Sequence, residues 1–435
     1  MLGVIFAERR QTGRFDLEAV EMATRTSLHQ AGAAALNELL QSPPPSERTV
    51  PCPCGERAHY RELRTKQILT VVGPVEVERP YYRCPHCRVS QSPQDAELDV
   101  QGTACSPGVR RMMALVGSQS SFESGRQQLE LLAGLTVTTK AVERQAEAIG
   151  ADIATREEAE IHRAQPLDWP ERSGPEIPVL YVQMDGTGVP VVPAEVQGRA
   201  GKVDGEPAHT REAKLGCVFT QTTLNPQGRP LRDEASTTYT GAMETAEEFG
   251  PRLYTEAQQR GWNRARKKVV MGDGAPWIWN LVPEHFPGAI EIVDLYHARQ
   301  HLWQLAAHLV PSDQASRRRW TRKMQRKLDQ GKIEQLVAAL RALPPPNPEM
   351  ALLLRTEADY FQRNAHRMRY PQFLRQKLFV GSGVIEAGCK TVIGLRFKQS
   401  GMFWTVRGAN AILALRCHRL SGKFEDYWEN RARAA

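Results

Sequence analysis

The chain has 435 residues and carries 57 Lys and Arg against 49 Asp and Glu, a formal net charge of +8. Hydrophobic residues make up 41% and charged residues 24%, which excludes a mostly disordered chain and leaves ample material for a core. No apolar run approaches the roughly 18 residues of a membrane-spanning helix, and the N-terminus does not resemble a signal peptide. We therefore expect a soluble intracellular protein. Its moderate excess of basic residues permits a polyanionic partner.

The N-terminal part of the chain predicts one helix followed by a linker. Residues 16–41 interleave acidic, apolar and small residues, which favours a helix. The stretch QSPPPSER at 41–48 is rich in Pro and Ser and predicts a linker.

Four of the eight cysteines fall in one short stretch after this linker. They form two close pairs, Cys52 with Cys54 and Cys84 with Cys87. Two strand-like runs separate the pairs, and two turns joined by a hairpin are typical of a zinc ribbon, because four thiolates satisfy tetrahedral Zn²⁺. The first pair is spaced more tightly than usual, so His59 or His86 could replace a thiolate, and four free thiols in a small β-domain are the alternative. The other four cysteines are expected to be buried small hydrophobic residues.

Residues 106–150 predict a helical region with the outline of a helix-turn-helix. Gly134 marks the short turn, and Thr138 or Thr139 would cap the second helix. Many helical hairpins share this outline, and we expect DNA contact here mainly because the region follows a zinc ribbon. The segment WPERSGPEIP at 169–178 predicts a second linker.

From residue 179 the pattern changes to strands. The run 179–192 predicts a strand, a turn at Gly186 and Gly188, and a second strand. The elements expected after it are a strand at 213–220, a helix at 243–260, strands at 267–273 and 289–297, helices over 295–380 with a break at 343–350, and a helical tail after 381.

Carboxylates stand where two of these strands end. Asp185 follows the apolar run VLYVQM, Asp273 follows KKVVMG, and small residues come next in both places. Glu386 lies in GSGVIEAGCK, at the entry to a helix with an apolar pattern. Carboxylate oxygens are the ligands that Mg²⁺ prefers, and three such acids can hold two metal ions for a phosphodiester displacement. Taken singly, each acid could instead be a turn or capping residue.

A basic stretch lies within the predicted helices at 317–327, with seven basic residues and no acid. On a helix, two rows of these side chains align: Arg319, Lys323 and Lys327 in one, and Arg318, Arg322 and Arg326 in the other. Such a face is often simply solvated, but here we expect contacts with DNA phosphates. Lys390, Arg396 and Lys398 could also line a path for DNA.

Several motifs resemble the transposases of bacterial insertion sequences. They are DGTGVPV around Asp185, REAKLGCVF at 211–219, GDGAPWIW around Asp273, DLYHARQHLW at 294–303, GSGVIEAGCK around Glu386, RFKQSGMFW at 396–404 and GANAILALR at 408–416. The group most similar is the ISKra group, which shares features with Mutator-like transposases. The resemblance covers roughly residues 50–430, including the paired cysteines and the helix-turn-helix outline.

This resemblance implies an α/β fold: an RNase H-like catalytic core with an all-helical insertion, preceded by a zinc-ribbon-like β module and a helix-turn-helix region. Asp185, Asp273 and Glu386 would be the DDE acids that bind Mg²⁺ or Mn²⁺, and Zn²⁺ would occupy the ribbon. The partners implied are DNA, as terminal inverted repeats and target DNA, and further copies in a homodimer or higher assembly. The location implied is the bacterial cytoplasm, in association with the nucleoid, with no membrane.

The resemblance and the residue patterns together predict six parts. In chain order they are an N-terminal helical region and linker (1–48), a zinc-ribbon-like module (49–100), a helical, helix-turn-helix-like DNA-binding region (101–168), the first part of the RNase H-like core (169–294), a helical insertion (295–380) and the C-terminal helical part of the core with Glu386 (381–435).

Asp294 and His297 form an Asp-x-x-His pair just past the last predicted strand. In a helix the two would share a face, and the family carries a similar motif, so we expect a supporting role near the active site or DNA. A hydrogen-bonded structural pair is the alternative. His297 and His301 are spaced like a zinc pair, but no His-Glu-x-x-His motif is present, which disfavours a metalloprotease.

The function expected is therefore a DNA transposase that hydrolyses phosphodiesters at the ends of an insertion sequence and then transfers the 3′-OH to target DNA. No Tyr or Ser nucleophile motif stands out, which disfavours recombinases that form a covalent intermediate. Two alternatives stay open: an RNase H-fold nuclease without strand transfer, and a zinc-dependent DNA-binding regulator derived from a transposase.

Overall fold

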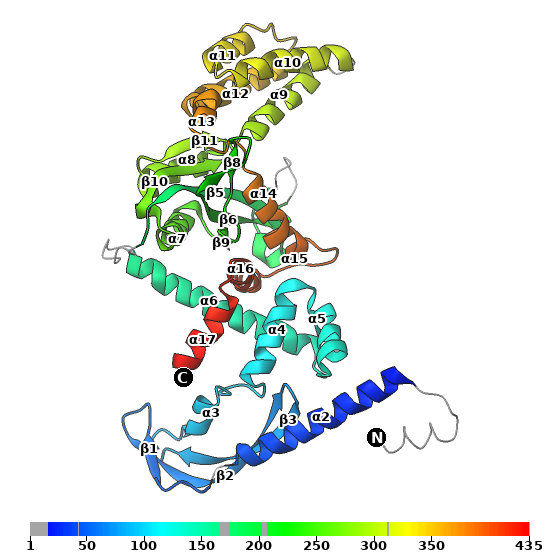
Figure 1. The fold of residues 1–435 in the computed structure, drawn as a ribbon, viewed down its shortest axis with the longest axis vertical. Helices are drawn as coiled ribbons and strands as arrows, with labels where there is room; N and C mark the ends of the chain where they lie inside the picture. Colours follow the sequence, from blue (N-terminus) through cyan, green and yellow to red (C-terminus); the bar gives the residue numbers. More distant parts are fainter. Residues whose placement is uncertain (1–15, 42, 165–173, 202–206, 311–312, 435) are drawn as a thin grey trace. The chain divides into compact units, whose positions relative to one another are not determined.

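The computed structural model describes residues 16–41, 43–164, 174–201, 207–310 and 313–434. The first 15 residues and residues 169–173 of the second expected linker lie outside these ranges. The chain divides into two compact units, Met1–Ile149 with Phe424–Ala435, and Gly150–Lys423 (Figure 1). No helix in the described ranges is long and apolar enough to cross a membrane.

The first unit contains a small antiparallel sheet in the order β1-β2-β3-β4. Its elements are α2 (Leu17–Leu39), β1 (Thr49–Pro51), β2 (Arg57–Thr70), β3 (Gly73–Arg83), β4 (Ser90–Gln91) and α3 (Pro93–Glu97). The helix expected at 16–41 is α2, which contacts β3, where the Asn37 side chain accepts a hydrogen bond from the Glu76 backbone N–H. The long β2–β3 hairpin is the framework that brings the two cysteine pairs together.

The helical part of this unit follows the order predicted for 106–150. It consists of α4 (Pro107–Gln119), α5 (Phe122–Gln128), the π-helical turn η1 (Leu129–Ala133) and the first part of α6 (Thr139–Ala164), and α17 (Phe424–Ala434) returns to the unit. Gly134 has a φ of 66°, in the left-handed region. Glycine adopts this conformation without the steric strain that a side chain would cause, so the chain can turn here. The Thr138 hydroxyl accepts from the Ala141 N–H at the start of α6. DNA contact by these helices stays a prediction.

The second unit is built around a mixed five-stranded sheet in the order β11-β10-β5-β6-β9. The strands are β5 (Ile177–Pro190), β6 (Thr210–Gln221), β9 (Thr238–Ala242), β10 (Ala265–Gly272) and β11 (Ile290–Val293), and a separate hairpin pairs β7 (Thr223–Leu224) with β8 (Pro230–Leu231). β5, β6 and β9 pair antiparallel, whereas β10 runs parallel to both β5 and β11. The mixed α/β class predicted from the sequence is confirmed.

The turn expected at Gly186 and Gly188 is wrong, because β5 continues through both residues. They pair with Lys214 and Glu212 of β6. A Cβ atom at Gly186 would lie 2.6 Å from the Glu212 carboxylate, so this glycine makes room for a neighbouring side chain instead of reversing the chain.

Helices cover both faces of this sheet. Gly216 of β6 approaches Leu253 of α7 (Ala246–Gln259), whereas the adjacent Leu215 approaches Gly388 of α14 (Gly383–Gly388). Because neighbouring residues of a strand point to opposite faces, α7 and α14 lie on opposite sides. α8 (Pro276–His285) packs against α7, where Gly250 approaches His285.

The remaining elements are mostly helical, as predicted for 295–380 and the tail. They are α9 (Leu295–Leu309), α10 (Gln314–Asp329), α11 (Ile333–Arg341), α12 (Pro348–Arg363), α13 (Tyr370–Arg375), the π-helical η5 (Cys389–Gly394), α15 (Leu395–Phe397) and α16 (Val406–Leu420), with 3₁₀ turns η2 (Pro193–Val196), η3 (Trp262–Arg264) and η4 (Ala365–Met368). Helices α9 to α13 form the bundle drawn beyond β11 in Figure 1.

We expect Gly150→Ala to destabilise the second unit. A Cβ atom at Gly150 of α6 would lie 1.9 Å from the carbonyl oxygen of Ala411 in α16, so the two helices must separate. Overpacking of this kind costs about 1–3 kcal/mol of unfolding free energy, which exceeds the roughly 1 kcal/mol that alanine gains over glycine in a helix. Urea unfolding followed by circular dichroism measures the change.

Gly394→Ala is the matched control, because its Cβ atom would meet only the Cys389 carbonyl oxygen at an ordinary 3.5 Å. We expect this variant to unfold at the wild-type urea concentration or slightly above it. Equal stability of the two variants would contradict the close α6–α16 crossing.

Candidate functional site

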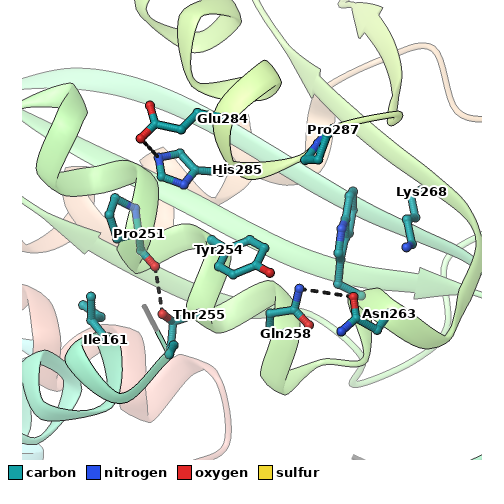
Figure 2. A pocket seen from close by; sticks show the side chains of 12 residues that line it. Ile161, Pro251, Tyr254, Thr255, Gln258, Asn263, Lys268, Glu284, His285 and Pro287 are labelled. Atoms are coloured by element: carbon teal, nitrogen blue, oxygen red, sulfur yellow. Dashed lines mark hydrogen bonds and ion pairs between the residues drawn. The ribbon is translucent and has the colours of Figure 1, made fainter. Parts of the chain in front are cut away.

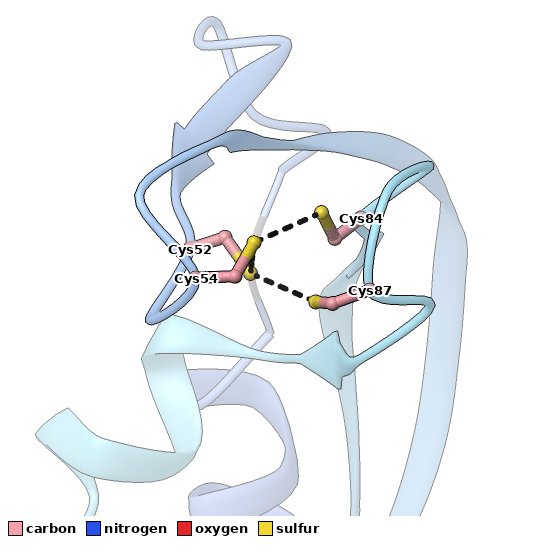
Figure 3. Close-up of side chains that lie close together, drawn as sticks. All are labelled: Cys52, Cys54, Cys84 and Cys87. Atoms are coloured by element: carbon pink, nitrogen blue, oxygen red, sulfur yellow. Dashed lines mark hydrogen bonds between the residues drawn. The ribbon is translucent and has the colours of Figure 1, made fainter.

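The four paired cysteines form a compact cluster in the first unit (Figure 3). The distances between sulfur atoms are 3.5 Å for Cys52–Cys87, 3.5 Å for Cys52–Cys54 and 3.7 Å for Cys54–Cys84. A zinc tetrahedron with Zn–S bonds of about 2.3 Å has edges of about 3.8 Å, so the spacing fits Zn²⁺. None of the four forms a disulfide. The backbone N–H of Cys87 lowers the pKa of Cys84 to about 7, whereas burial and the neighbouring thiols raise the pKa of Cys52 and Cys54, so the sulfur spacing and not the pKa values supports a metal site.

These four sulfur atoms lie within 4.8 Å of one another, and in the described part of the chain no other group of three or more metal-ligating side chains is as compact. The cluster can therefore hold zinc, and neither His59 nor His86 takes a thiolate's place in it. The two turns, each fixed by short backbone hydrogen bonds such as Gly55 N–H to Cys52 O and Arg88 N–H to Cys84 O, position the thiols before any metal binds.

A second group of candidate residues, all of them acidic, lies at one edge of the large sheet. Met271 of β10 lies beside Gln183 of β5, so continuing this parallel register by two residues brings Asp273 beside Asp185. Gly272 likewise lies beside Val293 of β11, which brings Asp294 to the same edge. The carboxyl ends of parallel strands are where open α/β sheets bind ligands.

Asp185 faces α14, the helix that carries Glu386. It pairs with Leu215, whose side chain meets Gly388, and the Cys389 thiol donates to Asp185 Oδ2 over 3.4 Å. Burial raises the pKa of Asp185, and the charges of Asp273 and Glu386 raise it further, while the Gly186 N–H and Cys389 lower it. Asp185 and Asp273 are half-buried and Glu386 is exposed. The three acids do not form a group as compact as the cysteines.

Gln183 and Cys389 support this edge and were not singled out by the sequence. Gln183 is fully buried and accepts a hydrogen bond from the Ile385 N–H over 3.0 Å, which ties the start of α14 to β5. The sequence did contain a signal: Gln183 is a polar residue within an apolar strand, and Cys389 lies one helical turn after Glu386.

Asp294 is the N-cap of α9 and is completely buried. One carboxylate oxygen accepts from the backbone N–H of His297 over 2.6 Å, and the other accepts from the backbone N–H of Ser382. The Asp-x-x-His contact is therefore made by the backbone of His297, not by its ring. Ser382 in turn contacts Glu386, with its hydroxyl 3.3 Å from Oε1, so Asp294 anchors the segment that enters α14.

The predicted basic residues of α10 lie together on one exposed face. Five of them line a single hollow: Arg318, Arg319, Arg322, Lys323 and Arg326. The opposite face is buried through Thr321, Met324 and Leu328. Within the described residues none of the five forms an ion pair, so the face keeps its positive charge. Lys327 lies at its margin, half-buried.

The prediction that Arg396 contacts DNA is wrong. Its side chain is completely buried, its guanidinium lies 4.8 Å from the centre of the Trp404 ring, and burial lowers its pKa to about 10. Lys390 and Lys398 are exposed as expected, and Lys398 donates to the Thr187 hydroxyl two residues after Asp185.

A separate cavity of about 480 Å³ lies among α6, α7, α8 and β10 (Figure 2). Tyr254, Lys268 and His285 are among the residues that line it. None of the described lining residues is one of the three acids, so this cavity is distinct from the acidic edge.

No protein-family model matches the chain, and no curated protein matches it. Among solved structures the chain is similar to the Drosophila P element transposase in its strand transfer complex, with a TM-score of 0.24 and 10% sequence identity over 74% of this chain and 80% of that one. A TM-score this low does not establish a shared fold, so the geometry of the chain itself carries the interpretation of the site.

We expect the purified full-length protein to contain about one zinc per chain, bound by the four cysteines. Cys54→Ser should lose most of this zinc and lower the melting temperature, because a structural zinc site contributes folding energy. Metal analysis by mass spectrometry and a thermal melt measure both effects.

Cys105→Ser is the control, because Cys105 lies in the same unit but outside the cluster. It should keep the metal. A wild-type protein without zinc, even when purified in its presence, would contradict the site.

Proposed function

We propose that this chain is a DNA transposase with a DDE triad formed by Asp185, Asp273 and Glu386. It would bind the terminal inverted repeats of an insertion sequence and catalyse their cleavage and transfer to target DNA. The observation that carries the proposal is the arrangement of the three carboxylates: Asp185 lies within β5, Asp273 directly follows the neighbouring parallel strand β10, and Glu386 lies on the helix that faces Asp185.

The strand order supports an RNase H-like core. The sheet has three antiparallel strands, β5, β6 and β9, followed by β10 and β11 running parallel to β5 on its other side. The first acid lies on β5, the second follows β10 and the third lies on a later helix. In this interpretation 169–294 is the first part of the core, 295–380 the helical insertion and 381–435 the part that returns with Glu386.

The donor set fits a hard divalent cation. All three side chains offer carboxylate oxygens, the described residues provide no ion-pair partner for Asp185 or Asp273, and their mutual repulsion favours a positive charge between them. Mg²⁺ or Mn²⁺, when bound by these acids, would supply Lewis-acid activation of the attacking oxygen and stabilise the leaving one.

The reaction consists of two displacements at phosphorus. In the first, water attacks a phosphodiester at the end of the element and the bond to the 3′-oxygen breaks, leaving a free 3′-OH. In the second, this 3′-OH attacks a phosphodiester of the target, a new P–O bond forms and the target's own 3′-oxygen leaves. The acids hold the reacting groups in line, and no covalent link between protein and DNA is formed.

The basic hollow of α10 supports DNA as the substrate, because a long polyanion is bound along its backbone as well as at the reacting phosphate. Lys398, bound to Thr187 near Asp185, and the exposed Lys390 in the turn after Glu386 add positive charge. In the first unit, 49–100 would be the zinc-ribbon-like module and 101–168 the helix-turn-helix-like region, both contacting the ends of the element. Pairing two ends would require a homodimer or a larger assembly.

We expect Asp185→Asn, Asp273→Asn and Glu386→Gln each to reduce metal-dependent DNA cleavage at least about a hundredfold, because each removes one charged metal ligand. The measurement is cleavage and joining of a plasmid that carries the native flanking DNA, with Mg²⁺ or Mn²⁺. Folding is checked for each variant by circular dichroism.

Glu176→Gln is the matched control. Glu176 is an exposed acid just before β5, at the opposite end of the same strand, and it should leave cleavage unchanged. Cleavage without joining would favour the nuclease, and unaltered activity of the triad variants with retained DNA binding would favour the regulator.

We expect the triple variant Arg318→Gln, Arg322→Gln and Arg326→Gln to bind DNA more weakly and with less salt dependence. Each lost phosphate contact makes the slope of log K against log salt less negative by about 0.9, so the expected change is up to about 2.7. Fluorescence anisotropy with a labelled duplex of the flanking DNA, over a salt series, measures the slope.

A second triple variant removes the same charge from nearby helices: Arg341→Gln, Arg355→Gln and Arg363→Gln. These arginines lie outside the hollow, so the slope should change little. If both triple variants change the slope equally, net charge and not the α10 face determines binding.

A further inference from the structure

Tyr360 of α12 reaches from the helical bundle to the acidic edge of the sheet. Its ring packs directly on Gly274, the residue after Asp273: a Cβ atom on this glycine would lie 1.9 Å from Tyr360 Cε2 and 2.9 Å from the hydroxyl oxygen. Gly274 is therefore required here for close approach of the tyrosine. The hydroxyl lies near enough to Asp273 and Asp294 for both charges to raise the pKa of Tyr360, after the larger effect of burial.

The Tyr360 hydroxyl is buried and has no hydrogen-bond partner among the described residues. Only 7% of the residue is exposed. A buried hydroxyl without a partner costs free energy, so most such groups in proteins are paired. Tyr370, a neighbouring buried tyrosine, follows the usual rule, since its hydroxyl donates to the Val293 carbonyl over 3.1 Å.

The position of the Tyr360 ring is fixed from its other side. The ring stacks on His301 with centroids 4.0 Å apart and an angle of 16° between the planes. His301 Nδ1 lies 2.9 Å from the carboxylate of Glu357, and its ring contacts His297. The histidine of α9 is therefore held by an acid of α12, and the tyrosine between it and Gly274 has little freedom to move.

We propose that the Tyr360 hydroxyl is a hydrogen-bond donor of the active site, and that its acceptor is a phosphate oxygen of the DNA bound at Asp273. This inference rests on the proposed transposase function. It assigns the helical bundle a direct part in the chemistry, in addition to the basic face of α10.

The surroundings of the hydroxyl suit this role. A tyrosine hydroxyl is protonated at neutral pH, so it can donate a hydrogen bond to a phosphate oxygen. A hydrogen-bond donor that is already oriented and desolvated can stabilise charge on a reacting phosphate, because neither the side chain nor the surrounding water has to rearrange during the reaction.

The test compares Tyr360→Phe with Tyr370→Phe in the full-length protein. Each variant removes one buried hydroxyl and keeps the ring. We expect Tyr360→Phe to keep the wild-type melting temperature and to bind flanking duplex DNA normally in Ca²⁺, but to cleave the plasmid about ten- to a hundredfold more slowly in Mg²⁺, the loss of one hydrogen bond to a charged oxygen. Tyr370→Phe should cleave normally and melt about 2–4 °C lower.

Two results would overturn the inference while leaving the triad intact. One is cleavage by Tyr360→Phe within twofold of the wild type. The other is a melting temperature lowered as in Tyr370→Phe, which would mean that the hydroxyl already has a partner in the protein. If wild type and Asp185→Asn cleave alike, the proposed function fails and this inference fails with it, so the two failures are distinguishable.

Discussion

The candidate site of the second unit depends on one electrostatic constraint: the charges of Asp273 and Glu386 act on Asp185 and raise its pKa, in addition to the effect of burial. Backbone N–H groups bind the three aspartates at this edge, and within the described ranges no Arg or Lys forms a salt bridge with them. Asp185 accepts from the Gly186 N–H, Asp273 from the Ala275 N–H, and Asp294 from those of His297 and Ser382. Backbone donors fix the orientation of a carboxylate but leave its full charge in place. In the proposed function an edge built this way would attract a cation from solution, whereas a salt bridge to Arg or Lys would already have neutralised it.

The same constraint explains why α14 is tied to the sheet by buried polar contacts. Glu386 would be repelled by the two aspartates, so its helix needs anchors that do not depend on charge. Gln183 provides one by accepting the Ile385 N–H, and Asp294 provides another through Ser382. Asp294 therefore positions α14 as a helix cap and not through the ring of His297. Its supporting role in the chemistry stays a prediction.

Short sequence patterns indicated the candidate residues that lie at the end of an apolar run or in closely spaced pairs. An apolar run ending in an acid indicated Asp185 and Asp273, which the structure brings to one edge of the sheet, and the two close pairs of cysteines indicated the four-cysteine cluster. Such patterns failed where the outcome depends on contacts between distant segments. A glycine pair that usually marks a turn lies inside β5, because β6 pairs along its whole length. Arg396 carries a charge that suggested DNA contact, but Trp404 covers it. Tyr360 lies 87 positions after Asp273 in the sequence, and no spacing rule connects them.

Helix α9 links the two roles assigned to the helical bundle. Its first turn is capped by Asp294 at the acidic edge, its middle carries His301 against Tyr360, and Arg299 forms an ion pair with Asp329 at the end of α10 over 2.9 Å. DNA on the basic face of α10 would thus be bound by a helix that contacts α9, and α9 also contacts the ring of Tyr360. Since α10 buries its apolar face in the bundle, it cannot shift far without disturbing α9. If the chain is the proposed transposase, the bundle would set the distance between the DNA backbone on α10 and the phosphate at the acids, which a flexible basic arm could not do.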